Sequence, residues 1–302
     1  MPPLDTIADR QAQWSVSANK LKAAIDTARW AVFALSILGA MLAALASQMG
    51  ARNPGAATAL VDDPRAWVAI AAAICLAFAT FFTQRLLGTD HVTAWIRARA
   101  IAEALKREAY KYAAGAAPYD DPDATKKAVL IEQERVKIEQ DGEDLLPTLV
   151  DGGAGQGSLP RDALTHDEYV QRRVDGQRTG FYQPKAGQYK KIAHRLRATE
   201  FGLALLATAI TAIASVYGKS APLFGINFDV AAFTAVLTTI AGAVLAHIEA
   251  SRYDFLVMTY LATARRLEDR RNGSKDPWST FVNDCEAIIA AENTSWIAKW
   301  TT

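Results

Sequence analysis

The chain has 302 residues, and its 33 Lys and Arg nearly balance its 32 Asp and Glu, so the formal net charge is +1. A nucleic-acid-binding face is strongly basic, and this charge balance gives no indication of one. Cys75 and Cys285 are 210 residues apart and the four histidines are scattered, which excludes a disulfide scaffold and a metal cluster.

The charged residues lie in blocks, although the mean hydropathy of +0.03 resembles that of an ordinary soluble protein. Four windows of the sequence contain no Asp, Glu, Lys or Arg: residues 30–51, 66–84, 201–218 and 230–248. A helix of about 18–20 residues covers the roughly 30 Å hydrocarbon core of a bilayer. We therefore expect transmembrane helices at about 30–49, 66–84, 201–218 and 230–248. A buried helical bundle in a soluble protein is the alternative, but its helices would need charged outer faces.

The basic residues beside these windows predict the orientation of the chain. The turns between the paired spans hold only Arg52, Arg65 and Lys219. The other flanks hold Lys20, Lys22, Arg29, Arg85, Arg97, Arg99, Lys185, Lys190, Lys191, Arg195, Arg197, Arg252, Arg265 and Arg266. Because Lys and Arg accumulate on the cytoplasmic side, we expect a multi-pass protein of an inner (plasma) membrane with both termini cytoplasmic.

The segments between the spans carry helical patterns. Residues 10–29 predict a helix that leads into the first span, and apolar residues between 89 and 114 recur at helical spacing. After a break at 118–122, residues 124–140 predict a second helix. Thr165 and Glu168 form a capping-box pattern that opens the next one. We expect an all-α membrane protein of two transmembrane hairpins (four spans) with long cytoplasmic amphipathic helices.

The last helix is expected to follow Asp276-Pro277, a cap residue and a first-turn proline. It carries an apolar stripe, which we interpret as a cytoplasmic packing surface. Its residues are Trp278, Phe281, Cys285, Ile288 and Trp296.

An approximate internal repeat with an offset of 168 residues relates the two parts of the chain. It pairs Trp14 with Tyr182 and Ala18 with Ala186, and continues through the start of each first span. The predicted domains are residues 1–150 and 163–302, each a cytoplasmic helix, a hairpin and a returning helix. The Gly-rich segment 151–162 is the predicted linker between them.

The sequence lacks the common catalytic motifs. The Gly-rich segment has neither a preceding strand nor a following Lys-Ser/Thr, so it is unlike a phosphate-binding loop, and no HExxH, GxSxG or paired-cysteine motif occurs. Cys285 lies on an apolar stripe without a nearby histidine, which favours core packing over nucleophilic catalysis. We expect no enzyme, no catalytic residues, no cofactor and no metal site.

Polar residues on the third and fourth spans have two interpretations. They could line a pore or groove when several chains associate. Alternatively, hydroxyls bond the carbonyls of their own helix and small residues pack helices together, as Gly39 and Ala43 would on the first span. The candidate pore or helix-contact residues are Thr208, Thr211, Ser215, Thr234, Thr238, Gly242 and Glu249.

Four stretches of the sequence resemble known effector domains: residues 97–106, 112–119, 169–186 and 281–296. The last two resemble the type-one domain of the SLATT family, and the first two resemble its type-three domain. SLATT domains are two-span effector domains associated with SMODS nucleotidyltransferases and SLOG sensor domains in bacterial conflict systems. The resemblance implies a tandem, type-three-like and then type-one-like. It also implies a membrane effector that forms pores or perturbs the membrane when a nucleotide or another infection signal is sensed.

Two hypotheses follow. The first is a homo-oligomeric, pore-forming effector of antiphage defence, with the lipid bilayer and a nucleotide-signalling or sensor protein as partners and no nucleic acid. The alternative is a non-conducting membrane scaffold that recruits a cytoplasmic partner through its helices.

Overall fold

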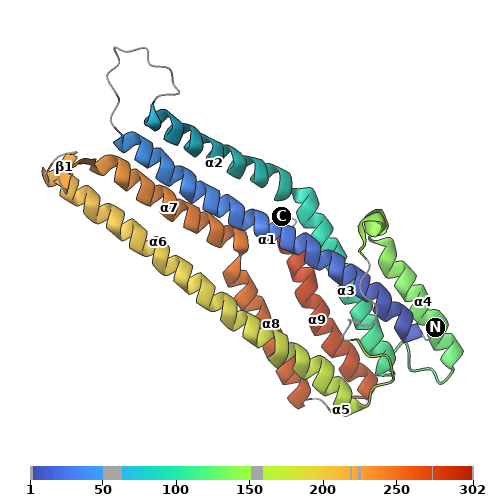
Figure 1. Ribbon diagram of the computed structural model, residues 1–302. Coiled ribbons are helices and arrows are strands. Elements are labelled where there is room, and N and C mark those ends of the chain that lie inside the picture. The colour runs from blue at the N-terminus through green and yellow to red at the C-terminus, as the bar shows by residue number, and fades with distance from the viewer. Residues whose placement is uncertain are drawn as a thin grey trace. The chain divides into compact units, whose positions relative to one another are not determined.

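A computed structural model describes residues 3–49, 63–150, 159–217, 220–223, 226–273 and 275–300. Helices make up nearly all of it (Figure 1). The first part contains α1 (Pro3–Gln48), α2 (Pro64–Leu86), α3 (Thr89–Ala113), α4 (Ala124–Gln140) and the short 3₁₀ helix η2 (Glu143–Thr148). The second contains α5 (His166–Tyr169), η3 (Val170–Asp175), η4 (Arg178–Tyr182), α6 (Gln183–Tyr217), β1 (Ser220–Leu223), β2 (Ile226–Asp229), α7 (Val230–Ser251), α8 (Tyr253–Gly273) and α9 (Trp278–Trp300).

The chain forms two compact units, and both parts of the sequence contribute to each. We call residues 26–88 and 190–254 the membrane unit, and residues 1–25, 89–189 and 255–302 the helical unit. Both α1 and α6 begin in the helical unit and end in the membrane unit. The predicted domains 1–150 and 163–302 therefore describe the order of elements along the chain, and as separately folding domains they stay a prediction.

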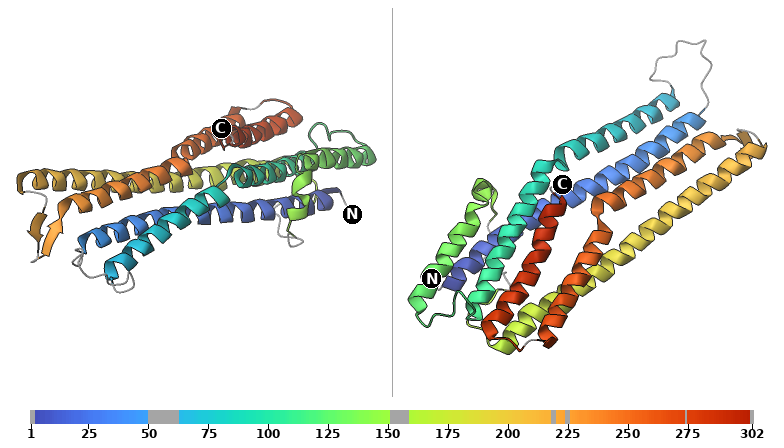
Figure 2. Two further views of the ribbon diagram at one scale, coloured as in Figure 1. Left: turned by 90° about the horizontal axis from the view of Figure 1, so that it is seen from above. Right: turned by 180° about the vertical axis from the view of Figure 1, so that it is seen from behind.

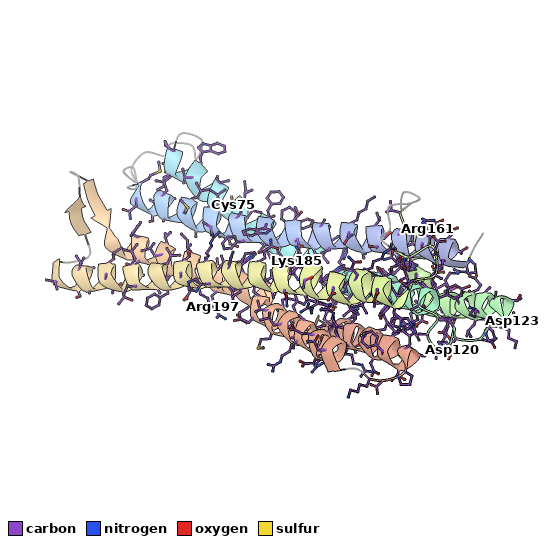
Figure 3. The ribbon with its side chains drawn as sticks, turned by 90° about the horizontal axis from the view of Figure 1, so that it is seen from below. Cys75, Asp120, Asp123, Arg161, Lys185 and Arg197 are labelled. Carbon is purple, nitrogen blue, oxygen red and sulfur yellow. The ribbon has the colours of Figure 1, made fainter. Side chains whose placement is uncertain are left out.

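The membrane unit contains the predicted spans. Four helices of the described chain are long and apolar enough to cross a membrane, and they include α1, α2, α6 and α7. This confirms the all-α membrane fold, with helix ends close to the predicted ones. In Figure 1 these helices lie in the order α2, α1, α7, α6. Cys75, labelled in Figure 3, lies on α2.

Close contacts join these spans. Gly39 on α1 is buried against α2, because a Cβ added there would lie 2.9 Å from the Leu76 side chain. The His247 ring on α7 lies 4.7 Å from the Trp30 ring and 4.9 Å from the Phe33 ring, both on α1. Aromatic packing at the ends of the spans thus connects the first hairpin to the second.

A short antiparallel hairpin joins α6 to α7, where only a turn was predicted. Its register pairs Ser220 with Asp229 and Leu223 with Ile226. Residues 50–62 and 151–158, which include most of the first inter-span turn and of the predicted linker 151–162, lie outside the described residues.

The helical unit is built around α3. Its predicted apolar face is buried, with Leu105 fully covered, and it packs against α4 and α9 (Figure 2). Trp14 of α1 is also fully buried, and Gly142 permits its close approach: an added Cβ would lie 2.7 Å from the Trp14 ring and 2.4 Å from Ile101.

The predicted helix at 124–140 is α4, which Asp123 caps by accepting from the Thr125 amide at 2.8 Å. The apolar residues of α4 lie in two environments, since Ile131 is buried while Val129 is 53% exposed. The predicted capping box is formed: the Thr165 hydroxyl accepts from the Glu168 amide and the Glu168 carboxylate accepts from the Thr165 amide at 2.9 Å. In Figure 3, Arg161 marks the segment before this cap, where it donates to Asp5 of α1 at 2.7 Å.

Two π-helical segments, η3 and η4, follow the capping box and lead into α6. Such segments are rare, and they often occur at functional sites because the wider turn re-aims side chains. Arg173, Val174 and Tyr182 on these turns are all buried.

Candidate functional site

The candidate pore residues of α6 lie on the surface of the membrane unit. Thr208, Thr211 and Ser215 are exposed. Their hydroxyls donate to carbonyls of their own helix, at 2.9, 2.8 and 2.7 Å respectively. These donors are satisfied without a partner helix, so the exposed face is compatible with lipid or with another chain.

The candidates on α7 have a similar arrangement. Thr238 is exposed and donates to the carbonyls of Thr234 and Ala235, and Thr234 itself is half-buried. Gly242 is exposed with no atom within 4 Å of an added Cβ, and Glu249 is exposed near the end of the helix.

The small residues of the first span lie in two environments. Gly39 is buried against Leu76, whereas Ala43 is exposed and lines a groove of about 390 Å³ within the membrane unit. Residues of α1, α2 and α7 form the groove: Ala40, Ala43, Ala44, Ser47, Leu76, Ala235, Val236 and Thr239.

The apolar stripe of α9 packs inside the helical unit. Trp278 stacks on His166 with ring centroids 3.8 Å apart, and its Nε1 donates to the Ala114 carbonyl at 2.9 Å. Phe281 and Cys285 are buried and Ile288 is half-buried. The side chain of Trp296 lies outside the described residues. Much of this surface is therefore already covered by the chain itself.

The helical unit contains a fully buried ion pair. Arg173 of η3 donates from Nε to Glu286 Oε1 at 2.9 Å and from Nη2 to Glu286 Oε2 at 2.7 Å, and both side chains are 1% exposed. The Tyr169 hydroxyl also donates to Glu286 at 3.0 Å, and the guanidinium lies 4.7 Å from the centroid of the Tyr110 ring. We call these four residues the Glu286 cluster.

The electrostatics of the cluster hold its groups in fixed protonation states. Burial by itself lowers the pKa of Arg173, but the attraction and hydrogen bonds of Glu286 outweigh it and raise the pKa above its ordinary value. Burial, with Glu286 beside it, raises the pKa of Tyr169. Burial also raises the pKa of the neighbouring Cys285 thiol to about 12, so this cysteine stays a protonated core residue.

A second cluster ties α1 to α4. Glu139 accepts hydrogen bonds from Trp14 Nε1 at 2.8 Å, from Arg10 Nε at 2.7 Å and from Arg135. We call these four residues the Glu139 cluster. Both clusters contain a buried glutamate that binds an arginine and an aromatic side chain four residues apart on one helix: Arg10 and Trp14 on α1, and Tyr169 and Arg173 at the start of the second part.

The Glu286 cluster also joins the two predicted domains. Tyr110 comes from α3 of the first, while Tyr169, Arg173 and Glu286 come from the second. Nearby, the Ala117 amide donates to Ser279 Oγ at 2.7 Å and the Leu164 amide donates to the Ala113 carbonyl at 2.8 Å. This arrangement can couple the position of α3, which follows the second span, to that of α9.

Sequence reasoning missed both clusters. Arg173 and Glu286 are 113 residues apart, and an arginine on a helix ordinarily indicates a solvated face. One signal for a buried glutamate was available in the sequence, because Glu286 directly follows Cys285 of the apolar stripe. Among the described residues, no group of three or more His, Cys, Asp or Glu could hold a metal ion.

Two family models match the chain in succession. Residues 169–296 match the SMODS and SLOG-associating 2TM effector domain 1, which confirms the resemblance of the second part. Residues 12–127 match a protein family of unknown function, DUF4231, and the likeness of this part to the type-three domain stays a prediction. No curated protein and no solved structure matches the chain. The matched effector domain and the four candidate spans together indicate a multi-pass membrane effector of conflict systems.

Proposed function

We propose that this protein is an effector of bacterial antiphage defence that assembles into homo-oligomers and permeabilises the membrane when its helical unit receives a signal. The observation that carries the proposal is the match to a 2TM effector domain in a chain with four candidate spans. Two of these helices, α1 and α6, continue into a helical unit that contains buried ion pairs. The signal is a nucleotide or a sensor protein.

The positions of the hydroxyl groups on α6 support the proposed oligomerisation. Thr208, Thr211 and Ser215 are exposed on one chain, so a pore lined by them requires further copies of the chain. Their internal hydrogen bonds keep the inactive chain compatible with lipid, and assembly would replace lipid by neighbouring spans.

Both termini and the helical unit are proposed to be cytoplasmic, in the inner membrane. Basic residues concentrated on the flanks outside the hairpin turns support this orientation. A reporter that is active only in the cytoplasm should be active when fused to either terminus. Activity of a reporter that works only in the periplasm, at either terminus, would contradict this orientation.

The functional test is induced expression in bacteria that carry a membrane-potential dye. We expect overproduction or phage infection to collapse the potential, and Thr208→Val with Thr211→Val to reduce this collapse at equal membrane levels. Thr179→Val is the matched control, because Thr179 makes the same kind of own-helix hydrogen bond at 2.8 Å but lies in the helical unit. An unchanged potential after both treatments contradicts the proposal.

The alternative is a non-conducting scaffold, favoured by the complete pairing of the Thr208, Thr211 and Ser215 hydroxyls within their helix. For a scaffold, the double valine variant keeps full protection against phage while the potential never changes. Under both functions the chain is proposed to act without catalysis.

A further inference from the structure

A cavity of about 110 Å³ lies between α3 and α9 in the helical unit. Ala100, Glu103, Ala104 and Arg107 line it from one face of α3, at helical spacing. The facing residues of α9 are Glu286, Ile289, Ala290, Asn293 and Thr294, and Arg173 closes one side. Alanines at facing positions leave the space open, because larger side chains there would fill it.

Arg173, which lines this space, carries an unsatisfied donor. Its Nε and Nη2 are bonded to Glu286, but the buried Nη1 has no hydrogen-bond partner among the described residues. A buried guanidinium N–H without an acceptor is costly, since it has lost its water without gaining a bond. The adjoining cavity is the space nearest to Arg173 in which an acceptor oxygen could lie.

A carboxylate lines the same cavity. Glu103 is half-buried and, within the part of the chain that the structure describes, has no hydrogen bond or ion pair. Three cationic side chains, Arg99, Lys106 and Arg173, attract the Glu103 carboxylate through space without forming an ion pair with it. The lining of the cavity therefore combines an unsatisfied donor with a carboxylate that accepts no hydrogen bond from the described residues.

The charge balance separates the classes of ligand. Arg173 is already paired with Glu286, and Arg107 with Glu108 at 2.9 Å, so neither guanidinium leaves a free positive charge for a simple anion. A simple cation would leave Arg173 Nη1 unsatisfied. A molecule with both a carboxylate and an ammonium meets both requirements, and the Asn293 amide can serve either end.

We propose that the cavity between α3 and α9 binds a small zwitterion of the α-amino acid class, with its carboxylate on Arg173 Nη1 and its ammonium on Glu103. The volume is below the ~150 Å³ of an engineered cavity that holds benzene, which limits the ligand to the smallest side chains. Thr294 lines the cavity and is exposed, so we place the opening of the cavity to solvent at this residue. This site is independent of whether the spans conduct.

The test uses the purified full chain in detergent micelles, with thermal unfolding followed by tryptophan fluorescence. Glycine and L-alanine at ten times their dissociation constants should raise the midpoint by roughly 3 °C. Acetate, methylammonium and inorganic phosphate at the same concentrations should leave it unchanged.

Three variants separate specific binding from the general stabilisation that amino acids produce as osmolytes. Glu103→Gln should abolish the shift, and Ala290→Leu, which fills the cavity, should abolish it too. Glu134→Gln, on α4 and absent from the cavity lining, should retain it. Three results would overturn the proposal: an equal shift of the unfolding midpoint in Glu103→Gln, a larger shift with phosphate, or no shift with any probe. The last result would indicate a cavity that is filled by water alone.

Discussion

At the scale of single residues, the two buried glutamates hold the helical unit together. Removing one partner of a buried ion pair leaves an uncompensated charge, which costs about 3–5 kcal/mol. Glu286→Gln should therefore lower the free energy of unfolding by about that amount, measured by denaturant titration of the purified protein. Glu132→Gln is the control, because its pair with Arg135 is on the surface and is worth at most about 1 kcal/mol. An equal loss of unfolding free energy in both variants would contradict a stabilising role for the buried Arg173–Glu286 pair.

The protonation state of Cys285 gives a second prediction at this scale. The thiolate is the reactive form, and folding raises the thiol pKa from 9.0 to about 12. In a Cys75→Ala background, Cys285 should resist maleimide at pH 8 until denaturant unfolds the helical unit. Because the folded state disfavours the thiolate, the contribution of Cys285 to the free energy of unfolding should fall as the pH rises from about 9 toward 12. Rapid labelling of the native protein, against an exposed cysteine introduced at Glu134, would show that the site is open.

At the scale of elements, the close approach of α1 and α2 depends on Gly39. A Cβ there lies 2.9 Å from Leu76, so Gly39→Leu should force the helices apart and cost about 1–3 kcal/mol in thermal or SDS unfolding. Gly242→Leu is the matched control, since nothing lies within 4 Å of an added Cβ at that position. Adding Leu76→Ala should recover part of the loss. An unstable Gly242→Leu beside a stable Gly39→Leu would contradict this packing.

The elements also show which features could be predicted from sequence. The bounds of α4 and the start of α5 were accessible because Asp123, Thr165 and Glu168 are local caps. The spans were accessible because a window without charges needs no tertiary information. The Arg173–Glu286 pair was not, since it depends on a chain reversal between residues 113 apart. The π turns and the β1–β2 register also lacked a periodic pattern to reveal them.

At the scale of the whole molecule, α3 from the first part of the chain packs against η3 and α9 from the second. We expect co-expressed fragments 1–157 and 158–302 to purify as a complex, and each fragment alone to aggregate, because separation exposes Leu105, Tyr110 and Val282. Size-exclusion chromatography after affinity capture of one fragment measures this. Two fragments that are each soluble, folded and independent would show that the helical unit is not shared.

At this scale the whole chain is proposed to permeabilise membranes when it receives a cytoplasmic signal. The direct measurement is dye release from liposomes that contain the purified chain, after addition of cytoplasmic extract from phage-infected or uninfected bacteria. We predict release with the infected extract, little with the uninfected one, and a reduced rate for the Thr208→Val and Thr211→Val double variant. Full retention of the dye with both extracts, by protein that is folded and inserted, would contradict the claim.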